Sequence, residues 1–162
     1  MIFVTVGTHE QPFDRLLKAV DDYAAKTDEQ VIVQSGYTDY EMKHCTWSKL
    51  LPYSEMIKNV EQARIVITHG GPSSFIMPLQ IGKTPIVVPR QEKYGEHVND
   101  HQLLFALEVE KRQKNILVVE DVSRLGAILD NYEQAVSQLS GGLTSNNAKF
   151  MEGFETLVQE LF

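Results

Sequence analysis

Two short apolar runs, with one helix-length segment between them, constrain the fold of this chain more than any other feature of its sequence. The runs are residues 65–67 and 85–89, and both are rich in isoleucine and valine. Short β-branched runs are typical of strands buried on both faces, as the strands of a parallel sheet are. Pro72 suits the first position of a helix between them, so the segment predicts a β-α-β unit.

The same alternation recurs along the rest of the chain. It predicts an α/β fold, with a Rossmann-like parallel sheet and helices on both faces. Further strands are expected at 2–6, 31–33 and 116–119, together with a short strand that ends near Pro52.

Start and stop signals place the helices. Pro12 is expected to begin the first helix, and Ser54 and Asp121 are expected to cap two later ones. Another helix is expected over 98–110, and a final helix over about 146–161 follows the break at Gly141 and Gly142. Pro78 should kink or shorten the helix that begins at Pro72.

The size predicts a single domain over residues 1–162, and the composition argues against several classes of protein. The formal net charge of −7 argues against a nucleic-acid partner, because binding to phosphates needs a basic surface. No apolar run approaches the roughly 20 residues that span a bilayer, and the N-terminus lacks the basic segment of a signal peptide. The single cysteine, Cys45, allows no internal disulfide and is expected to be unreactive. These features predict a cytoplasmic protein.

Two glycine-containing turns follow predicted strands and suggest a phosphate site. His69, Gly70 and Gly71 come directly before the helix that begins at Pro72, where backbone N–H groups and the helix dipole attract anions. Ser73 and Ser74 add hydroxyl donors in the first helical turn. Gly7 and Thr8 end the first strand in a similar way. The alternatives are a tight turn at Gly7 and a histidine whose ring nitrogens hold its own loop.

The polar segment from Glu96 to Gln102 allows two interpretations. His97 and His101 are four residues apart, so on a helix they would share a face and, with Glu96 and Asp100, could bind zinc or iron. Asn99, His101 and Gln102 suit hydrogen bonding to sugar hydroxyls equally well. Residues 82–84, Gly-Lys-Thr, are not a P-loop, because residue 77 is Met and a strand follows.

Three segments together resemble glycosyltransferase family 28: VTVGT at residues 4–8, ITHGGPSS at 67–74, and PRQ through HQ at 89–102. The similarity is to the C-terminal, nucleotide-sugar-binding half of these enzymes and covers nearly the whole chain. It is strongest to enzymes whose catalytic subunit is a separate short chain. Among these are the N-acetylglucosaminyltransferase of the dolichol pathway and bacterial enzymes of capsule and exopolysaccharide synthesis.

The resemblance implies an inverting transfer of a hexose from a UDP-sugar to a polyprenyl-diphosphate-linked glycan, without a cofactor or metal. It implies a fold equivalent to the C-terminal half of a GT-B glycosyltransferase. It also implies a heterodimer with a membrane-anchored subunit, which binds the lipid-linked saccharide acceptor and recruits this chain to the inner face of the membrane. A homodimer of the isolated chain is an alternative.

The resemblance also assigns roles to residues. Gly7 and Thr8 would contact the diphosphate, and Leu51 would lie near the uracil. The phosphates would be lined by His69, Gly70, Gly71, Ser73 and Ser74, and the donor sugar would face Asn99, His101 and Gln102. Many relatives bind the ribose with a glutamate where this chain has Met77, so Gln80 or Glu96 is expected to take that role.

His69 is the expected catalytic residue on the donor side, and His9 is the candidate general base in this chain, because histidine titrates near neutrality. Two rival functions remain. One is a metal-dependent hydrolase that uses His69, His97 and His101. The other is a noncatalytic nucleotide-binding module.

Overall fold

The fold is built on one parallel sheet whose strand order reverses at its centre. The computed structural model describes residues 1–139. Six strands pair in the order β3-β2-β1-β4-β5-β6, and every pair is parallel. The strands are β1 (Ile2–Thr5), β2 (Val31–Gln34), β3 (Thr46–Ser48), β4 (Ile65–His69), β5 (Ile86–Val88) and β6 (Leu117–Val118).

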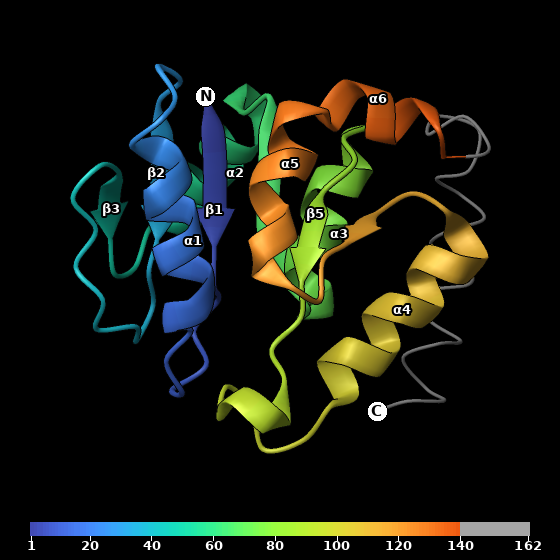
Figure 1. Ribbon diagram of the computed structural model, residues 1–162, viewed down its shortest axis with the longest axis horizontal. Coiled ribbons are helices and arrows are strands. Elements are labelled where there is room, and N and C mark those ends of the chain that lie inside the picture. The colour runs from blue at the N-terminus through green and yellow to red at the C-terminus, as the bar shows by residue number, and fades with distance from the viewer. Residues whose placement is uncertain (140–162) are drawn as a thin grey trace.

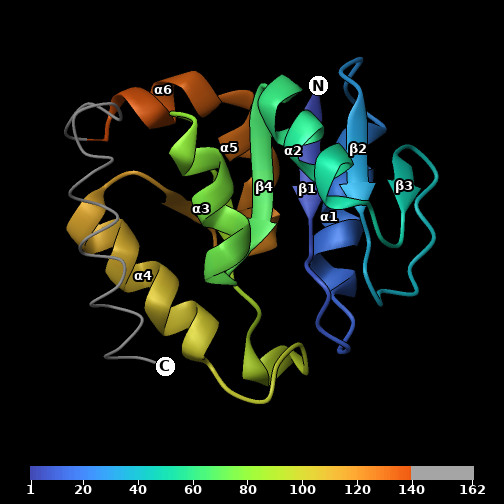
Figure 2. The ribbon, with the colours of Figure 1, turned by 180° about the vertical axis from the view of Figure 1, so that it is seen from behind.

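Helices cover both faces of this sheet. Figure 1 shows α1 and α5 in front of the strands, and Figure 2 shows α2, α3 and α4 on the opposite face. The α-helices are α1 (Asp14–Ala24), α2 (Tyr53–Gln62), α3 (Pro72–Gln80), α4 (His101–Gln113), α5 (Leu125–Asp130) and α6 (Tyr132–Ser137). Two short 3-10 helices, η1 (Glu92–Tyr94) and η2 (Val122–Arg124), complete the described elements.

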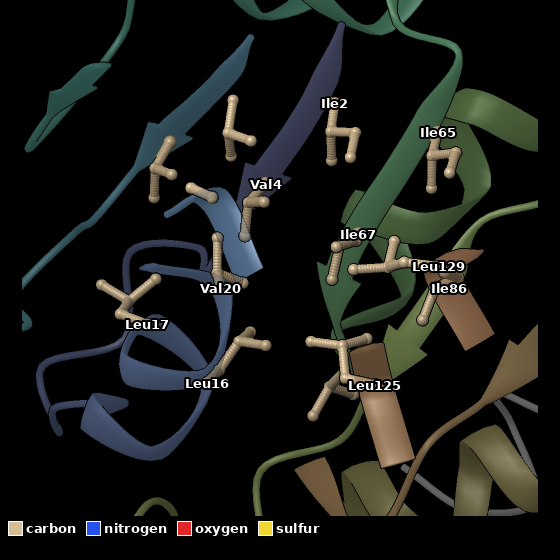
Figure 3. Close-up of a cluster of buried hydrophobic side chains, with 14 of the residues drawn as sticks. Ile2, Val4, Leu16, Leu17, Val20, Ile65, Ile67, Ile86, Leu125 and Leu129 are labelled. Atoms are coloured by element: carbon tan, nitrogen blue, oxygen red, sulfur yellow. The ribbon is translucent and has the colours of Figure 1, made fainter. Parts of the chain in front are cut away.

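Alternating side chains of the strands divide the core between the two faces, as the two-residue period of a strand requires. Ile65 and Ile67 of β4 join the cluster under α1 and α5, whereas Val66 packs with Val60 of α2. Figure 3 shows the α1 and α5 side, where the apolar stripes of both helices meet the strands. Its labelled helical residues are Leu16, Leu17, Val20, Leu125 and Leu129. The central strands therefore bury apolar side chains on both faces, which explains why the sequence shows them as uninterrupted apolar runs.

The predicted α/β fold, with a parallel sheet and helices on both faces, is confirmed. The predicted first residue Pro72 and the cap at Asp121 are also confirmed, and Asp121 Oδ1 accepts a hydrogen bond from the Ser123 amide at 3.0 Å. Pro78 lies inside α3, which ends two residues later at Gln80. The final helix predicted at about 146–161 lies outside the described residues.

Several predicted boundaries were wrong, and local hydrogen bonds explain two of them. The helix predicted from Val98 begins only at His101, because Asn99 Oδ1 accepts the His101 amide in a side-chain turn that competes with helix. The helix predicted to be capped by Ser54 is capped by Pro52 and begins at Tyr53, two residues earlier than expected, and the Pro52 carbonyl accepts the amides of Glu55 and Met56.

The predicted positions of two other elements were also wrong. The first helix begins at Asp14 rather than at Pro12. The short strand expected to end near Pro52 is β3, which ends at Ser48. Among residues 1–139, no helix is long and apolar enough to cross a membrane.

The strands end at the lower, carboxyl edge of the sheet in Figure 1, and we call the region where the loops after β1, β4 and β5 meet the crevice. Strand β1 pairs with β2 on one side and with β4 on the other. The chain therefore leaves the carboxyl ends of β1 and β4 in opposite directions, which makes this edge the switch point of the sheet. Ligands of open α/β sheets bind at such a switch point.

A charge network holds the opposite, amino edge of the sheet. Arg64 binds both carboxylate oxygens of Glu29, at 2.7 and 3.0 Å, and also reaches Glu133 at 2.6 Å. The Met1 amino group adds a second cation to Glu29 at 3.0 Å. Hydrogen bonding to Arg64 is the main cause that lowers the pKa of Glu29 from 4.5 to about 2.

We expect Glu29→Gln to lower the free energy of unfolding by about 1 kcal/mol at pH 7, because the network is partly exposed. A carboxyl whose pKa falls on folding stabilises the fold above its unfolded pKa, and this stabilisation is lost as the pH falls from 4.5 toward 2. We therefore expect urea unfolding to show a smaller difference in the free energy of unfolding between Glu29→Gln and wild type at pH 3 than at pH 7. The control is Glu41→Gln at an exposed site. A difference that is equal at both pH values would contradict the role of the charge.

Candidate functional site

Three loops meet at the carboxyl edge of the sheet. They follow β1 at residues 6–13, β4 at 70–71 and β5 at 89–100. Figure 1 shows the first and third of these loops side by side at the bottom of the molecule. Nearly all of the predicted site residues lie in these loops or in the first turns of α3 and α4, and Leu51 is the exception.

The first and second loops touch through two glycines and one histidine. A Cβ atom at Gly7 would lie 2.4 Å from His69 Nε2, and one at Gly71 would lie 2.1 Å from His69 Cε1. Gly7 also has a φ of +75°, which residues with a side chain rarely adopt. The imidazole therefore occupies space that any other residue at position 7 or 71 would fill. As predicted, Gly7, His69 and Gly71 come together in space.

The His69 ring is held from both nitrogens inside its own turn. Nδ1 accepts a hydrogen bond from the Gly71 amide at 3.0 Å, so the proton of the neutral ring lies on Nε2, which donates to Ser74 Oγ at 2.9 Å. Burial lowers the pKa of His69 to about 3, and the positive charge of Arg90 adds to the effect. A neutral ring with both nitrogens engaged shapes the turn and is not a free acid or base. Of the two sequence interpretations, the geometry favours the histidine that holds its loop.

The two amides expected to bind phosphate are already hydrogen-bonded within the protein. The Gly71 amide donates to His69, and the Gly70 amide donates to Gln102 Oε1 at 3.2 Å. The prediction that they are free donors therefore needs correction. The exposed Ser73, one residue into α3, lies where helical N–H groups have no intrahelical partner, and this end of the helix can still attract an anion.

Gln102 joins two strand ends rather than projecting a free carboxamide oxygen into the crevice. The buried Oε1 accepts the amides of Gly70 and of Arg90, at 3.2 and 3.1 Å. Gln102 was expected to face the donor sugar. In this structure its oxygen instead fastens the ends of β4 and β5 to α4.

The proposed ribose ligand Glu96 also has another role. Arg15 binds both of its carboxylate oxygens, at 2.9 and 3.0 Å, and the Gln91 amide donates to Oε1 at 3.2 Å. The side chain is buried, so these contacts satisfy it. In this structure the Glu96 carboxylate anchors the loop after β5 to α1, and its role as a donor-binding residue stays a prediction.

The two histidines of the metal hypothesis do not share a helix. His97 lies in the loop before α4, and His101 is the first residue of α4. The His97 ring instead packs on His9, with ring centroids 4.5 Å apart and planes tilted by 60°. Within residues 1–139, no group of three or more His, Cys, Asp or Glu side chains has the arrangement of a metal site. The shared helical face, on which the hydrolase alternative depends, was wrong.

His9 lies in the loop after β1, at intermediate exposure. Its Nε2 is buried without a hydrogen-bond partner, as is Gln11 Oε1 in the same loop. Thr8, beside it, is exposed. The loop therefore brings a histidine with an unused ring nitrogen and an exposed hydroxyl to the crevice.

Sequence analysis missed Arg90, which organises this edge. Its guanidinium is fully buried and donates to the carbonyls of Val6, Gln11 and Glu96 at 2.9, 2.6 and 3.1 Å. It also lies over the Phe13 ring, 4.9 Å from the centroid. Its place directly after the predicted strand at 85–89 is a signal in the sequence that could have distinguished it from a surface arginine.

The other predicted ligands lie at the margins of the crevice. Half-buried Leu51 and Met77 pack with the cluster of Phe3 and Val66, on the α2 and α3 side. Met77 and Gln80 also line a cavity of 140 Å³ between α2 and α3, with Tyr53 at its edge. Gln80 thus lies beside Met77, the position where many relatives have the glutamate that binds the ribose. This agrees with the expectation that Gln80 could take that role.

Two features elsewhere support the sequence interpretation. Lys83 donates to the carbonyls of Val60, Glu61 and Ala63, so it caps the end of α2 and is not a P-loop lysine. Burial and the neighbouring Asp21 raise the pKa of Cys45 to about 12, in agreement with an unreactive thiol. A larger cavity of 700 Å³ lies between α1 and the η2–α5 segment, away from the crevice.

Comparison with known proteins identifies a family. The model of the glycosyltransferase family 28 C-terminal domain matches residues 1–157. No curated protein matches the chain.

Two solved structures match this chain, and the first of them is similar in fold. One, described as the glycotransferase of kitacinnamycin, is 17% identical with a TM-score of 0.57, and the match covers 99% of this chain and 43% of that one. The other, the glycosyltransferase SnogD from Streptomyces nogalater, is 17% identical with a TM-score of 0.49, covering 93% of this chain and 42% of that one. The chain thus spans less than half the length of either protein. The family match and the first structure confirm the predicted equivalence with the C-terminal half of a GT-B glycosyltransferase.

We expect Gly7→Ala to lower the free energy of unfolding by about 2–4 kcal/mol, because it adds a clash with His69 to the cost of a positive φ. Gly95→Ala is the matched control. Its φ is +69° and nothing lies within 4 Å of the added Cβ, so only about 1–2 kcal/mol should be lost. Urea denaturation measures both. Equal losses of unfolding free energy in the two variants would show that the contact with the His69 ring does not contribute to the effect of Gly7→Ala.

Proposed function

Because this chain belongs to glycosyltransferase family 28, through its C-terminal domain, we propose that it is the donor-binding, catalytic part of an inverting glycosyltransferase. The donor is a UDP-sugar, and the acceptor is a hydroxyl of a polyprenyl-diphosphate-linked glycan in exopolysaccharide or capsule synthesis. The observation that carries the proposal is the crevice at the switch point, where Gly7, His69 and the first turn of α3 meet.

The crevice suits the diphosphate of a nucleotide-sugar. Gly7 and Gly71 let the His69 ring lie between the two loops, and the α3 N-terminus with Ser73 offers donors and a positive dipole end to the diphosphate. The neutral His69 ring holds the turn in this shape. Leu51, Tyr53 and the cavity beside Met77 and Gln80 provide an apolar surface for the nucleoside.

In the proposed reaction, the acceptor oxygen forms a bond to the anomeric carbon as the bond from that carbon to the β-phosphate oxygen breaks. UDP leaves with the bonding electron pair, and a base takes the proton of the acceptor hydroxyl. Donors oriented before the reaction toward the departing phosphate lower the barrier, and losing one such donor costs on the order of 10²–10³ in rate. No metal or other cofactor is part of this proposal.

His9 is the proposed base within this chain. It lies in the loop after β1, and its Nε2 has no hydrogen-bond partner and can accept a proton. Thr8 and Asn99, on neighbouring loops, are proposed to meet the donor together with His101.

Exposed apolar side chains around the crevice support a covering partner. Large apolar residues on the two sides of the carboxyl edge are more than a third exposed, namely Tyr37, Leu50 and Tyr53 after β2 and β3, and Tyr94, Val98 and Leu104 after β5. Rims of this kind mark interaction surfaces. The chain also spans only 43% of a solved protein that covers nearly all of it, which leaves room for a second domain in the complete enzyme.

We therefore propose that a membrane-anchored, acceptor-binding subunit covers the crevice in a heterodimer. This subunit would present the lipid-linked saccharide and hold the chain at the cytoplasmic face of the membrane. A homodimer through the same apolar rim is the competing assembly, and size-exclusion chromatography with light scattering distinguishes the two.

Titration of the isotope-labelled full chain with UDP tests donor binding directly. We expect amide shifts at Gly7 and Ser73 that persist when a chelator is present, with Glu29 at the opposite edge as the internal control. Shifts at His97 and His101 on adding zinc, with no response to UDP, would instead support the metal-dependent hydrolase. UDP binding without transfer in the assembled complex would support the noncatalytic module.

We expect His9→Ala to lower kcat by about 10²–10⁴ in the assembled complex, with little change in the donor KM, because the base acts on the acceptor proton. His44→Ala is the control, since His44 is exposed on the segment between β2 and β3. The measurement is transfer from radiolabelled donor to the lipid-linked acceptor. If His9→Ala keeps the wild-type rate, the base belongs to the partner subunit.

A further inference from the structure

Arg90 carries a buried positive charge that is held by backbone carbonyls. The side chain is fully buried, and its guanidinium donates to the backbone carbonyls of Val6, Gln11 and Glu96. Among residues 1–139, no carboxylate forms an ion pair with it. Burial lowers the pKa of Arg90 only to about 10, so the group remains charged at neutral pH.

The one carboxylate close to Arg90 is already neutralised. Both oxygens of Glu96 bind Arg15, so these two side chains form a neutral pair. Arg90 is then a surplus positive charge inside a protein of net charge −7. Because an unpaired buried charge is costly, its position needs an explanation beyond packing.

Arg90 lies directly beneath the crevice. Its carbonyl partners Val6 and Gln11 flank the loop that carries Gly7 and His9, and its third partner, Glu96, precedes His97. Its positive charge lowers the pKa of both His69 and His97, in addition to the effect of burial. The field of the guanidinium therefore reaches the ring that lies between the ends of β1 and β4.

Unsatisfied polar atoms gather at the same place. Arg90 Nε, His9 Nε2 and Gln11 Oε1 are all buried without a hydrogen-bond partner. The Gly70 and Gly71 amides, which would otherwise face an anion, are engaged with Gln102 and His69. The crevice thus has a buried cation below it and few free amide donors around it.

We propose that Arg90 is an electrostatic positioning residue, whose unpaired charge attracts the donor diphosphate and stabilises UDP as it leaves, without touching it. The inference rests on the proposed function, because it assumes that the crevice binds a uridine nucleotide. In this proposal Arg90 supplies the positive potential that the sequence analysis expected from the Gly70 and Gly71 amides.

The test compares a charged and an uncharged ligand of the same site, UDP and uridine, on the full chain. Arg90→Gln keeps hydrogen-bond donors for the carbonyls and removes the charge. It should weaken UDP binding about tenfold and change uridine binding by less than about twofold. Arg64→Gln is the matched control, because Arg64 belongs to the network at the amino edge and should leave the ratio of the two affinities unchanged.

Glu96→Gln provides a variant whose expected effect cannot come from damage to the fold. It removes the negative charge that neutralises Arg15 and keeps an oxygen for that side chain, so the net positive charge near the crevice rises by one. UDP should then bind several-fold more tightly while uridine binding stays constant. A third readout needs no ligand. The pKa of His97, followed by NMR of the imidazole, should rise in Arg90→Gln, because the cation that lowers it has gone.

The outcomes separate this inference from the function on which it rests. If wild type binds both ligands and Arg90→Gln weakens both equally, Arg90 only holds the loops and the inference is wrong. An unchanged pKa of His97, or weaker UDP binding in Glu96→Gln, would also overturn it. If wild type binds neither ligand, the proposed donor site itself is wrong, and this role for Arg90 is rejected with it.

Discussion

The close contact between the His69 ring and the backbone at Gly7 and Gly71 is the interaction on which the rest of the candidate site depends. It joins the ends of β1 and β4, the two strands at which the sheet order reverses. The ring fits only because neither glycine has a side chain, and its nitrogens then hold Gly71 and Ser74 in place. Buried in this way, the imidazole stays neutral and acts as a rigid part of the turn.

Many polar side chains at the carboxyl edge bind backbone groups of the protein itself. The ends of buried strands leave N–H and C=O groups that must find partners away from water. Gln102 supplies one oxygen for the amides of Gly70 and Arg90, and Arg90 supplies donors for the carbonyls of Val6 and Gln11. Amide and guanidinium groups that suit a sugar or a phosphate suit these backbone groups equally well, so residue type alone does not separate the two roles.

The sequence predicted the region of the site better than the roles within it. Gly7, His69 and Gly71 meet as expected, because strand ends and glycine turns follow from local pattern. Several of the failures lie in the loop after β5. Asn99 accepts the His101 amide and delays the start of α4, which separates His97 from His101, and Arg15 takes Glu96 from a distant part of the chain. Side-chain contacts between segments 80 residues apart leave no periodic signal, and for the same reason Arg90 was missed.

The sequence by itself determined the α/β class, the parallel sheet and the family, because apolar periodicity, turn residues and short motifs are local properties of the chain. Only the tertiary structure decided what each polar group at the carboxyl edge does. Whether Glu96, Gln102 and the glycine amides are free depends on which distant groups reach them. The surplus charge of Arg90 likewise exists only because folding pairs Glu96 with Arg15 and buries Arg90 beside the crevice.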